Sequence, residues 1–105
     1  MIFRKRRFAD LITRQLDVFS EDEARGLLDE VREAKAKYDR ADRDEAEEIY
    51  GDYVDVVEAA TEALADMRWR YAGTLDETTA AEYEAAFNRA VQKRWPPLGL
   101  EIENR

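Results

Sequence analysis

Carboxylates are the side chains whose type and spacing could do chemistry in this chain, since Asp and Glu make up 25 of its 105 residues. Glu30 with Glu33 and Glu45 with Glu48 stand at Glu-x-x-Glu spacing, and Asp52 follows about one helical turn later. On a helix this spacing places both carboxylates of a pair on one face. Such oxygens are the ligands that Mg²⁺ prefers, so a magnesium-dependent all-helical enzyme is one alternative.

The Glu-x-x-Glu pairs match only half of a known magnesium motif. All-helical nucleotide pyrophosphohydrolases bind magnesium through Glu-x-x-Glu followed by Glu-x-x-Asp, and no Glu-x-x-Asp occurs in this sequence. Glu48, Asp52 and Asp55 are expected to point away from the apolar stripe of their helix. A solvated acidic face is the ordinary explanation of such a run, so we expect no metal and no other cofactor.

Two residue types on which many enzymes depend are missing. The chain has no cysteine and no histidine, which excludes thiol catalysis and zinc thiolates and removes the commonest general base. Helical chorismate mutases work without either, through Arg, Lys, Glu and Gln lining a bundle. The residues of those types that come into question are Arg25, Arg32, Lys35 and Gln92. Only Lys35 falls on an apolar stripe, so the sequence predicts neither an enzyme nor a small-molecule site.

Basic residues gather at the N-terminus, where Arg4, Lys5, Arg6 and Arg7 are adjacent. Residues 1–19 carry net +3, whereas residues 20–66 carry 17 acidic and six basic groups, net −11. Four cations at a helix start oppose the helix dipole, so an acidic surface should compensate them. We expect that surface to be the chain's own acidic middle or that of a second copy.

The alternative role for residues 4–7 is docking on anionic lipid or RNA. Because an acidic body repels polyanions, nucleic acid is not expected as a partner, and membrane contact is expected at most peripherally through the N-terminus. The longest uncharged run, residues 95–100, is too short to cross a bilayer. Asp10 and Arg14 interrupt what would be a signal peptide's apolar region, so we expect a cytoplasmic protein.

Trp69 is the residue most informative about binding. Helical periodicity places it about 150° around its helix from the apolar stripe. An outward-facing tryptophan indicates an interface, because tryptophan is enriched at binding hot spots. The cover is either a partner chain or the apolar part, Pro96 to Ile102, of the C-terminal tail, residues 96–105. Leu98, Leu100 and Ile102 alternate there like an extended strand and are the tail's candidate interaction residues.

Periodicity also predicts the elements that carry these residues. Ala, Glu, Lys, Leu and Arg make up 55 of the 105 residues, a share typical of long helices. Apolar residues recur at helical spacing in four segments, residues 5–19, 21–40, 43–72 and 75–95. Capping boxes at Ser20–Glu23 and Thr74–Glu77 are expected to begin the second and fourth segments. Gly73 is expected to end the third, and Pro96 the fourth.

Residues 39–44 decide whether the second and third segments form a hairpin or one long helix. They contain no glycine or proline, which favours a continuous helix. However, Asp42 and Glu45 form a capping-box pair, and Ala41 is the only stripe residue between Tyr38 and Ile49. We predict a tight turn, because a hairpin buries both apolar stripes within one chain.

The small and aromatic residues around this join resemble the packing positions of one tetratricopeptide-type hairpin. The matching residues are Ala34, Ala46 and Tyr50, whereas Lys37 and Tyr53 depart from the pattern. The resemblance covers about one repeat, and a single repeat cannot stack into a solenoid. It therefore implies shared hairpin packing rather than membership of that family.

The predicted fold class is all-α, with residues 1–105 forming one domain of four helices and an extended C-terminal tail. Leu, Ile, Val and Phe number only 22, so the core is thin and stability is expected to depend on a partner. The predicted function is a non-enzymatic protein–protein interaction module. It would either self-associate or serve as a small subunit of a larger assembly.

Overall fold

The structure is a computed structural model, which describes residues 7–21 and 25–105. Its elements are α2 (Ala9–Glu21), α3 (Arg25–Arg40), α4 (Ala46–Ala72), α5 (Glu77–Arg94), the short 3₁₀ helix η1 (Pro96–Leu98) and α6 (Gly99–Glu103). Every regular element within the described ranges is helical, so the all-α class is confirmed there. Arg4, Lys5, Arg6 and the predicted capping residue Glu23 lie outside the described residues.

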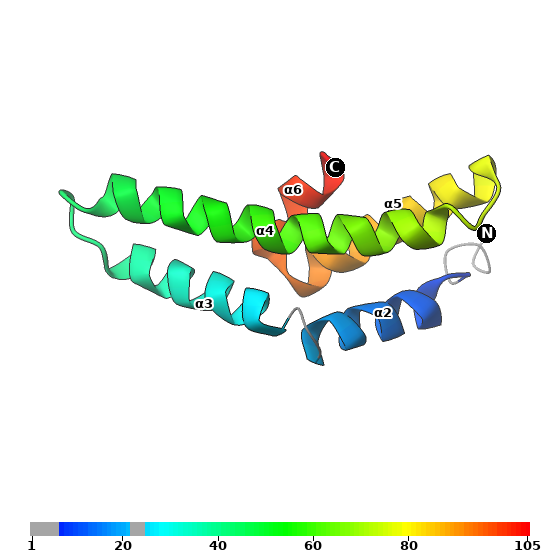
Figure 1. Ribbon diagram of the computed structural model, residues 1–105, viewed down its shortest axis with the longest axis horizontal. Helices are drawn as coiled ribbons and strands as arrows, with labels where there is room; N and C mark the ends of the chain where they lie inside the picture. Colours follow the sequence, from blue (N-terminus) through cyan, green and yellow to red (C-terminus); the bar gives the residue numbers. More distant parts are fainter. Residues whose placement is uncertain (1–6, 22–24) are drawn as a thin grey trace.

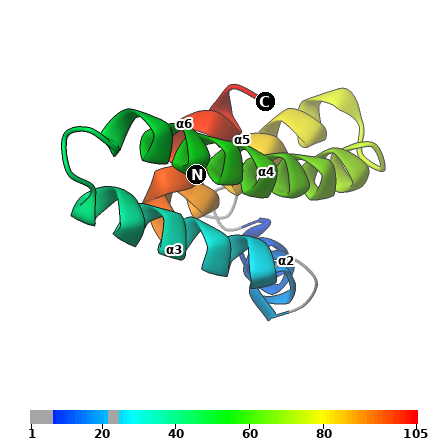
Figure 2. The ribbon, with the colours of Figure 1, turned by 60° about the vertical axis from the view of Figure 1, so that its left-hand side comes forward.

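Helix α4 is the longest element, at 27 residues, and it organises the molecule. Helices α3 and α2 follow one another along one side of it, and α3 runs antiparallel to the first half of α4 (Figure 1). Helices α5 and α6 pack against α4 away from α3, as the turned view shows (Figure 2). The result is an elongated shape that measures 50 × 24 × 23 Å. Among the described residues, no helix has both the length and the apolar character needed to cross a membrane.

The chain reverses between α3 and α4 through a turn closed by Asp42. Its carboxylate accepts hydrogen bonds from the backbone N–H groups of Asp44 and Glu45, each at 3.1 Å. These bonds hold the turn that leads into α4, whose N-cap residue, Glu45, has no side-chain capping bond of its own. At the other end of α4, Gly73 donates its N–H to the Trp69 carbonyl at 3.0 Å. Gly73 thus ends α4 as predicted, and its φ of −63° is right-handed.

Two predicted capping boxes are wrong. Ser20 lies inside α2 and its hydroxyl donates to the Asp17 carbonyl at 3.0 Å. The Thr74 hydroxyl donates to the Tyr71 carbonyl at 2.7 Å, so this residue closes α4. Asp76 caps α5 instead, by accepting the Thr79 N–H at 2.9 Å. Serine and threonine can bond either forward to an amide or back to a carbonyl, and sequence alone does not distinguish these bonds.

The core forms where α2, the second half of α4, α5 and α6 meet. Its most deeply buried large residues have at most 2% of their surface exposed: Leu16, Leu64, Tyr83, Phe87, Val91, Leu98 and Ile102. Helix α4 buries a second stripe beside the predicted one, which includes Thr61 and Arg68. The single stripe predicted for α4 was therefore too narrow, because this helix has neighbours on two sides.

The C-terminal tail is helical, so the predicted extended tail is wrong. Leu98 and Ile102 are fully buried, whereas 79% of Leu100 is exposed. Residues four apart share one face of a helix, which reconciles the alternating apolar pattern with a helical backbone. The tail begins close to α5, since a Cβ added at Gly99 would lie 3.1 Å from the Gln92 side chain. Glycine permits this approach, and Gln92 donates a hydrogen bond to the Gly99 carbonyl at 3.3 Å.

Candidate interaction surfaces

Trp69 lies on the outer face of α4 with 74% of its surface exposed. The tail does not cover it, because α6 packs against α4 and α5 through its buried residue Ile102, whose carbonyl bonds Arg68. Of the two covers predicted from the sequence, the tail is therefore wrong. Leu100, the exposed residue of the tail, likewise remains in solvent.

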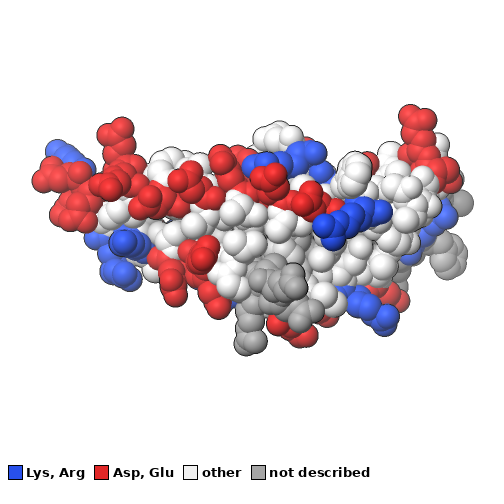
Figure 3. Space-filling model, in the orientation of Figure 1, with Lys and Arg blue, Asp and Glu red and all other residues white. Residues whose placement is uncertain are grey.

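Trp69 continues a row of carboxylates along the same face of α4. We call this row the acidic stripe, and its members are all exposed: Glu48, Asp52, Asp55, Glu62 and Asp66. At 3.6 residues per turn, the stripe and Trp69 fall within an arc of about 100°, over a length of about 31 Å. Acidic side chains form an almost continuous row over α4 from the α3–α4 turn towards the middle of the helix (Figure 3).

Among the described side chains, one cation pairs with the acidic stripe. Glu62 lies 3.8 Å from the Arg105 guanidinium, and 71% of the Glu62 side chain is exposed. For its other four members, no lysine or arginine nitrogen lies within 4.0 Å among residues 7–21 and 26–105. Like charges three and four residues apart on a helix repel one another, so a cationic partner would stabilise this face.

Arg7 is the only member of the basic run that the structure describes. Its guanidinium lies 3.8 Å from the Glu82 carboxylate of α5 and 5.4 Å from the centre of the Phe8 ring. It thus pairs outside the acidic middle of the chain, residues 20–66. Helix α2, which follows Arg7, begins at the end of the molecule where α4 finishes, opposite the α3–α4 turn (Figure 1).

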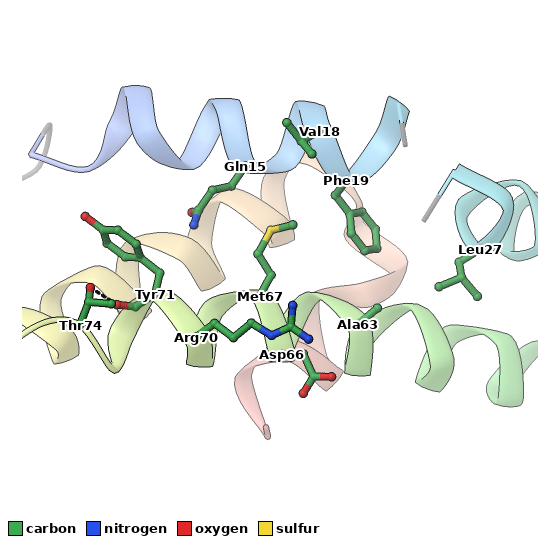
Figure 4. Close-up of a pocket in the computed structure, with 10 residues that line it drawn as sticks. All are labelled: Gln15, Val18, Phe19, Leu27, Ala63, Asp66, Met67, Arg70, Tyr71 and Thr74. Carbon is green, nitrogen blue, oxygen red and sulfur yellow. Dashed lines mark hydrogen bonds between the residues drawn. The ribbon is translucent and has the colours of Figure 1, made fainter. Parts of the chain in front are cut away.

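A second surface is an open groove of about 880 Å³ between α2 and α4. It exists because α2 rests on α5: Phe8 meets Tyr83 edge-on at 5.4 Å, and Gln15 accepts a 2.9 Å hydrogen bond from the Tyr83 hydroxyl. Figure 4 shows the lining side chains, which are Gln15, Val18, Phe19, Leu27, Ala63, Asp66, Met67, Arg70, Tyr71 and Thr74. The lining is mostly apolar and suits apolar side chains. Sequence analysis did not anticipate this groove.

Arg68 is a buried cation that sequence analysis also missed. Only 6% of it is exposed, and its Nη1 donates to Asn88 Oδ1 at 2.6 Å and to the Ile102 carbonyl at 3.0 Å. The Glu84 carboxylate lies 4.0 Å from Nε, which has no hydrogen-bond partner. Arg68 therefore ties α6 to α4 and α5. Arg68 follows Leu64 by four residues and therefore shares its helix face, and this spacing was the one sign in the sequence that Arg68 is buried.

The residues considered for catalysis do not converge. Lys35 bonds Asp39 at 2.8 Å, and this hydrogen bond raises the pKa of Lys35. Arg32 pairs with Asp29 at 3.3 Å, and Gln92 donates a hydrogen bond to the Gly99 carbonyl at 3.3 Å. The Arg25 side chain lies outside the described part. Within that part, no three carboxylates are grouped so that they could hold a metal ion.

The titratable core residue with the largest perturbation is Tyr83. Burial raises its pKa to about 12. Its ring packs against Phe8, Tyr71 and Phe87, so its environment is that of a structural core residue.

Comparisons of the chain with protein-family models, with curated proteins and with solved structures find no match. What the chain does must therefore be argued from its own surfaces.

Proposed function

We propose that this chain is a non-enzymatic protein-interaction module, and that its binding surface is the outer face of α4, formed by the acidic stripe and Trp69. The observation that carries the proposal is Trp69, which exposes 74% of its surface beside a row of carboxylates. A large aromatic left in water forgoes roughly 2–3 kcal/mol of burial free energy. A partner that covers it recovers this free energy.

The character of the face supports a protein partner. Tryptophan supplies a broad apolar contact, and interface hot spots are enriched in it. The surrounding carboxylates supply charges that restrict which partners dock, because an unlike-charged surface is favoured and a like-charged one is repelled. A non-enzymatic role is supported by the dispersed positions of Arg32, Lys35 and Gln92, which pair with separate neighbours.

Site-specific photo-crosslinking in native lysate tests the proposal. A crosslinking amino acid at Ala59, which is exposed and lies on the acidic stripe, should give discrete protein adducts. The same amino acid at Ala81, exposed on α5, is the matched control and should give far fewer. Adding Trp69→Ala to the Ala59 variant should reduce the adducts at least about tenfold, as expected when a hot-spot side chain is truncated.

The groove between α2 and α4 is the competing surface. Val18→Lys places a charge in that groove on α2 rather than on α4, since Val18 is 46% exposed. Asp66 is the one acidic-stripe residue that also lines the groove, and the other four stripe residues do not line it. The proposal expects the Ala59 adducts to survive this substitution. Loss of adducts with Val18→Lys but not with Trp69→Ala would move the binding surface to the groove and overturn the proposal.

A further inference from the structure

We infer that the outer face of α4 binds the basic run of a second copy of this chain, Arg4–Arg7, so that copies associate head to tail. This inference rests on the proposed function and names the partner of the same surface. Both sides of the contact, the basic run and the outer face of α4, then belong to the same sequence.

Charge complementarity is the first argument. The acidic stripe presents five carboxylates along about 27 Å of helix, and only Glu62 among them has a cation of the described side chains within 4.0 Å. The same chain carries four adjacent cations, Arg4, Lys5, Arg6 and Arg7, between two phenylalanines. A segment of this composition is the kind of partner that a row of carboxylates beside an exposed aromatic fits.

The shape of the molecule favours a contact between copies over a contact within one copy. The described member of the run, Arg7, precedes α2 directly and pairs with Glu82 in the first half of α5. Helices α2 and α5 both begin at the end of the molecule where α4 finishes, whereas the first half of α4, which carries Glu48, Asp52 and Asp55, extends towards the other end of an axis 50 Å long (Figure 1). Arg4 stands three residues before Arg7, and three residues span at most about 11 Å when fully extended. The far half of the acidic stripe is thus outside the reach of the basic run of the same copy.

Trp69 supplies the apolar part of the same contact. Arginine stacks over the face of tryptophan, and this chain already contains such a pair, with the Arg94 guanidinium 5.0 Å from the Trp95 ring centre. Trp69 stands one turn beyond Asp66, so a basic segment that lies along the stripe also reaches the indole. The phenylalanines at positions 3 and 8 bring apolar groups to the same run.

A head-to-tail contact uses different surfaces on the two copies. Each added copy therefore leaves one basic run and one acidic stripe available, and assembly continues until a ring closes or material is exhausted. The mass in solution should rise with protein concentration beyond that of a dimer. Because the contact is electrostatic and exposed, high salt should weaken it and dissociate the copies.

A charge swap tests the inference. The run variant carries Arg4→Glu, Lys5→Glu and Arg6→Glu, and retains Arg7 because of its pair with Glu82. The stripe variant carries Asp52→Lys and Asp55→Lys. The matched control carries Glu30→Lys and Glu33→Lys, two exposed acidic residues of α3. Sedimentation velocity is measured at ionic strengths of about 0.02 M and about 0.5 M, with circular dichroism to verify helicity.

The wild type and the control should both associate at low salt and approach the 12.3 kDa monomer at high salt. Each swapped variant alone should need at least about tenfold more protein to associate. An equimolar mixture of the run and stripe variants should associate like the wild type, since each then meets an opposite charge. If the stripe variant loses helicity, Asp52→Asn with Asp55→Asn replaces it and should weaken association without the rescue.

A wild type that stays monomeric at low salt overturns the inference, as does a mixture that associates no better than its components. The proposed function is judged separately by the adducts at Ala59. Adducts to other proteins that persist while the purified chain stays monomeric would leave the proposed function standing and this inference refuted.

Discussion

Two regions of the molecule differ sharply in how they are stabilised. We call residues 34–55 the arm, which comprises the end of α3, the turn and the start of α4, and we call the other described residues the body. In the arm only Ile49 is buried, with 9% of its surface exposed. In the body, Leu64, Tyr83 and Phe87 have no exposed surface. Because α4 runs through both regions, the difference in burial comes from the elements that surround this helix and not from helix formation.

The arm lacks a third element to enclose it, and aromatic contacts take the place of a core. The Tyr38 ring lies 5.2 Å from Tyr50 and 6.4 Å from Tyr53, yet Tyr38 and Tyr50 are 36% and 50% exposed. Each aromatic pair contributes about 0.5–1.5 kcal/mol beyond area burial, less than a filled core does. Helix α4 is therefore continuous in structure, although the contacts that stabilise it are concentrated in its second half.

The largest expected effect is a difference in the free energy of unfolding between two substitutions in α4, one in the body and one in the arm. Leu64→Ala, in the body, should lower the free energy of unfolding by about 2–5 kcal/mol, because the cavity is enclosed by α2, α5 and α6. Ile49→Ala, in the arm, should cost less than half as much, since an open two-helix site can collapse. Urea denaturation of both variants measures this. Equal losses would show that the arm is as tightly packed as the body.

Substitution of Arg68 measures how much its hydrogen bonds contribute to the stability of the body. Arg68→Met removes the donor to Asn88 and to the Ile102 carbonyl, so we expect a loss of about 1–3 kcal/mol and faster amide hydrogen exchange in α6. Arg70→Met, on the exposed neighbouring position, is the control and should change stability by less than about 0.5 kcal/mol. A variant that is more stable than the wild type would mean that desolvation of this cation outweighs its bonds.

Hydrogen exchange of the wild type compares the stability of the two halves of α4 without any substitution. Amides of residues 47–55 should exchange at least about tenfold faster than those of residues 60–71, a difference of about 1.4 kcal/mol in opening free energy. The reason is that few buried apolar groups hold the arm closed. Mass spectrometry of deuterated peptides resolves the two halves of α4, and uniform protection along the helix would contradict the division.

The smallest expected effect concerns pH in the body. Burial raises the pKa of Tyr83 from 10.0 to about 12, so the folded state favours the neutral phenol. The stability that this provides is complete below pH 10 and is lost as the pH rises through about 12. Tyr83→Phe should cost about 0.5–1.5 kcal/mol below pH 10, through the lost bond to Gln15. It should also flatten the decline above pH 10.

The control for this pH effect lies in the arm. Tyr50→Phe alters an exposed phenol and should retain the steep wild-type decline between pH 10 and about 12. Urea denaturation at several pH values in that window measures both variants. An unchanged slope in Tyr83→Phe would assign the alkaline transition to other groups.

Much of the secondary structure was predictable from local spacing. Phe8, Ile12, Leu16 and Phe19 stand at helical intervals and are all buried in the structure. Asp42 was predicted to cap the reversal after α3, and its carboxylate accepts the Glu45 N–H. Such features depend on residues within one or two turns, whose geometry a helix fixes. Trp69 was predicted to face outward for the same reason, and it does.

The features that were missed depend on which elements meet. Leu98 and Ile102 suit a strand face or a helix face equally well, and packing against α4 and α5 selects the helix. Arg68 is polar, so its burial makes sense only once Asn88 and the Ile102 carbonyl lie within reach. The groove exists because α2 rests on α5 rather than on α4.

Local spacing in the sequence was sufficient to predict the four longer helices, the outward position of Trp69 and the opposed charges of residues 1–19 and 20–66. The conformation of the tail, the second buried stripe of α4 and the separation of Arg7 from the far carboxylates depend on how the helices pack. The physical reason is that apolar periodicity reports that a face is buried, whereas the identity of the covering element follows from contacts between segments distant in sequence.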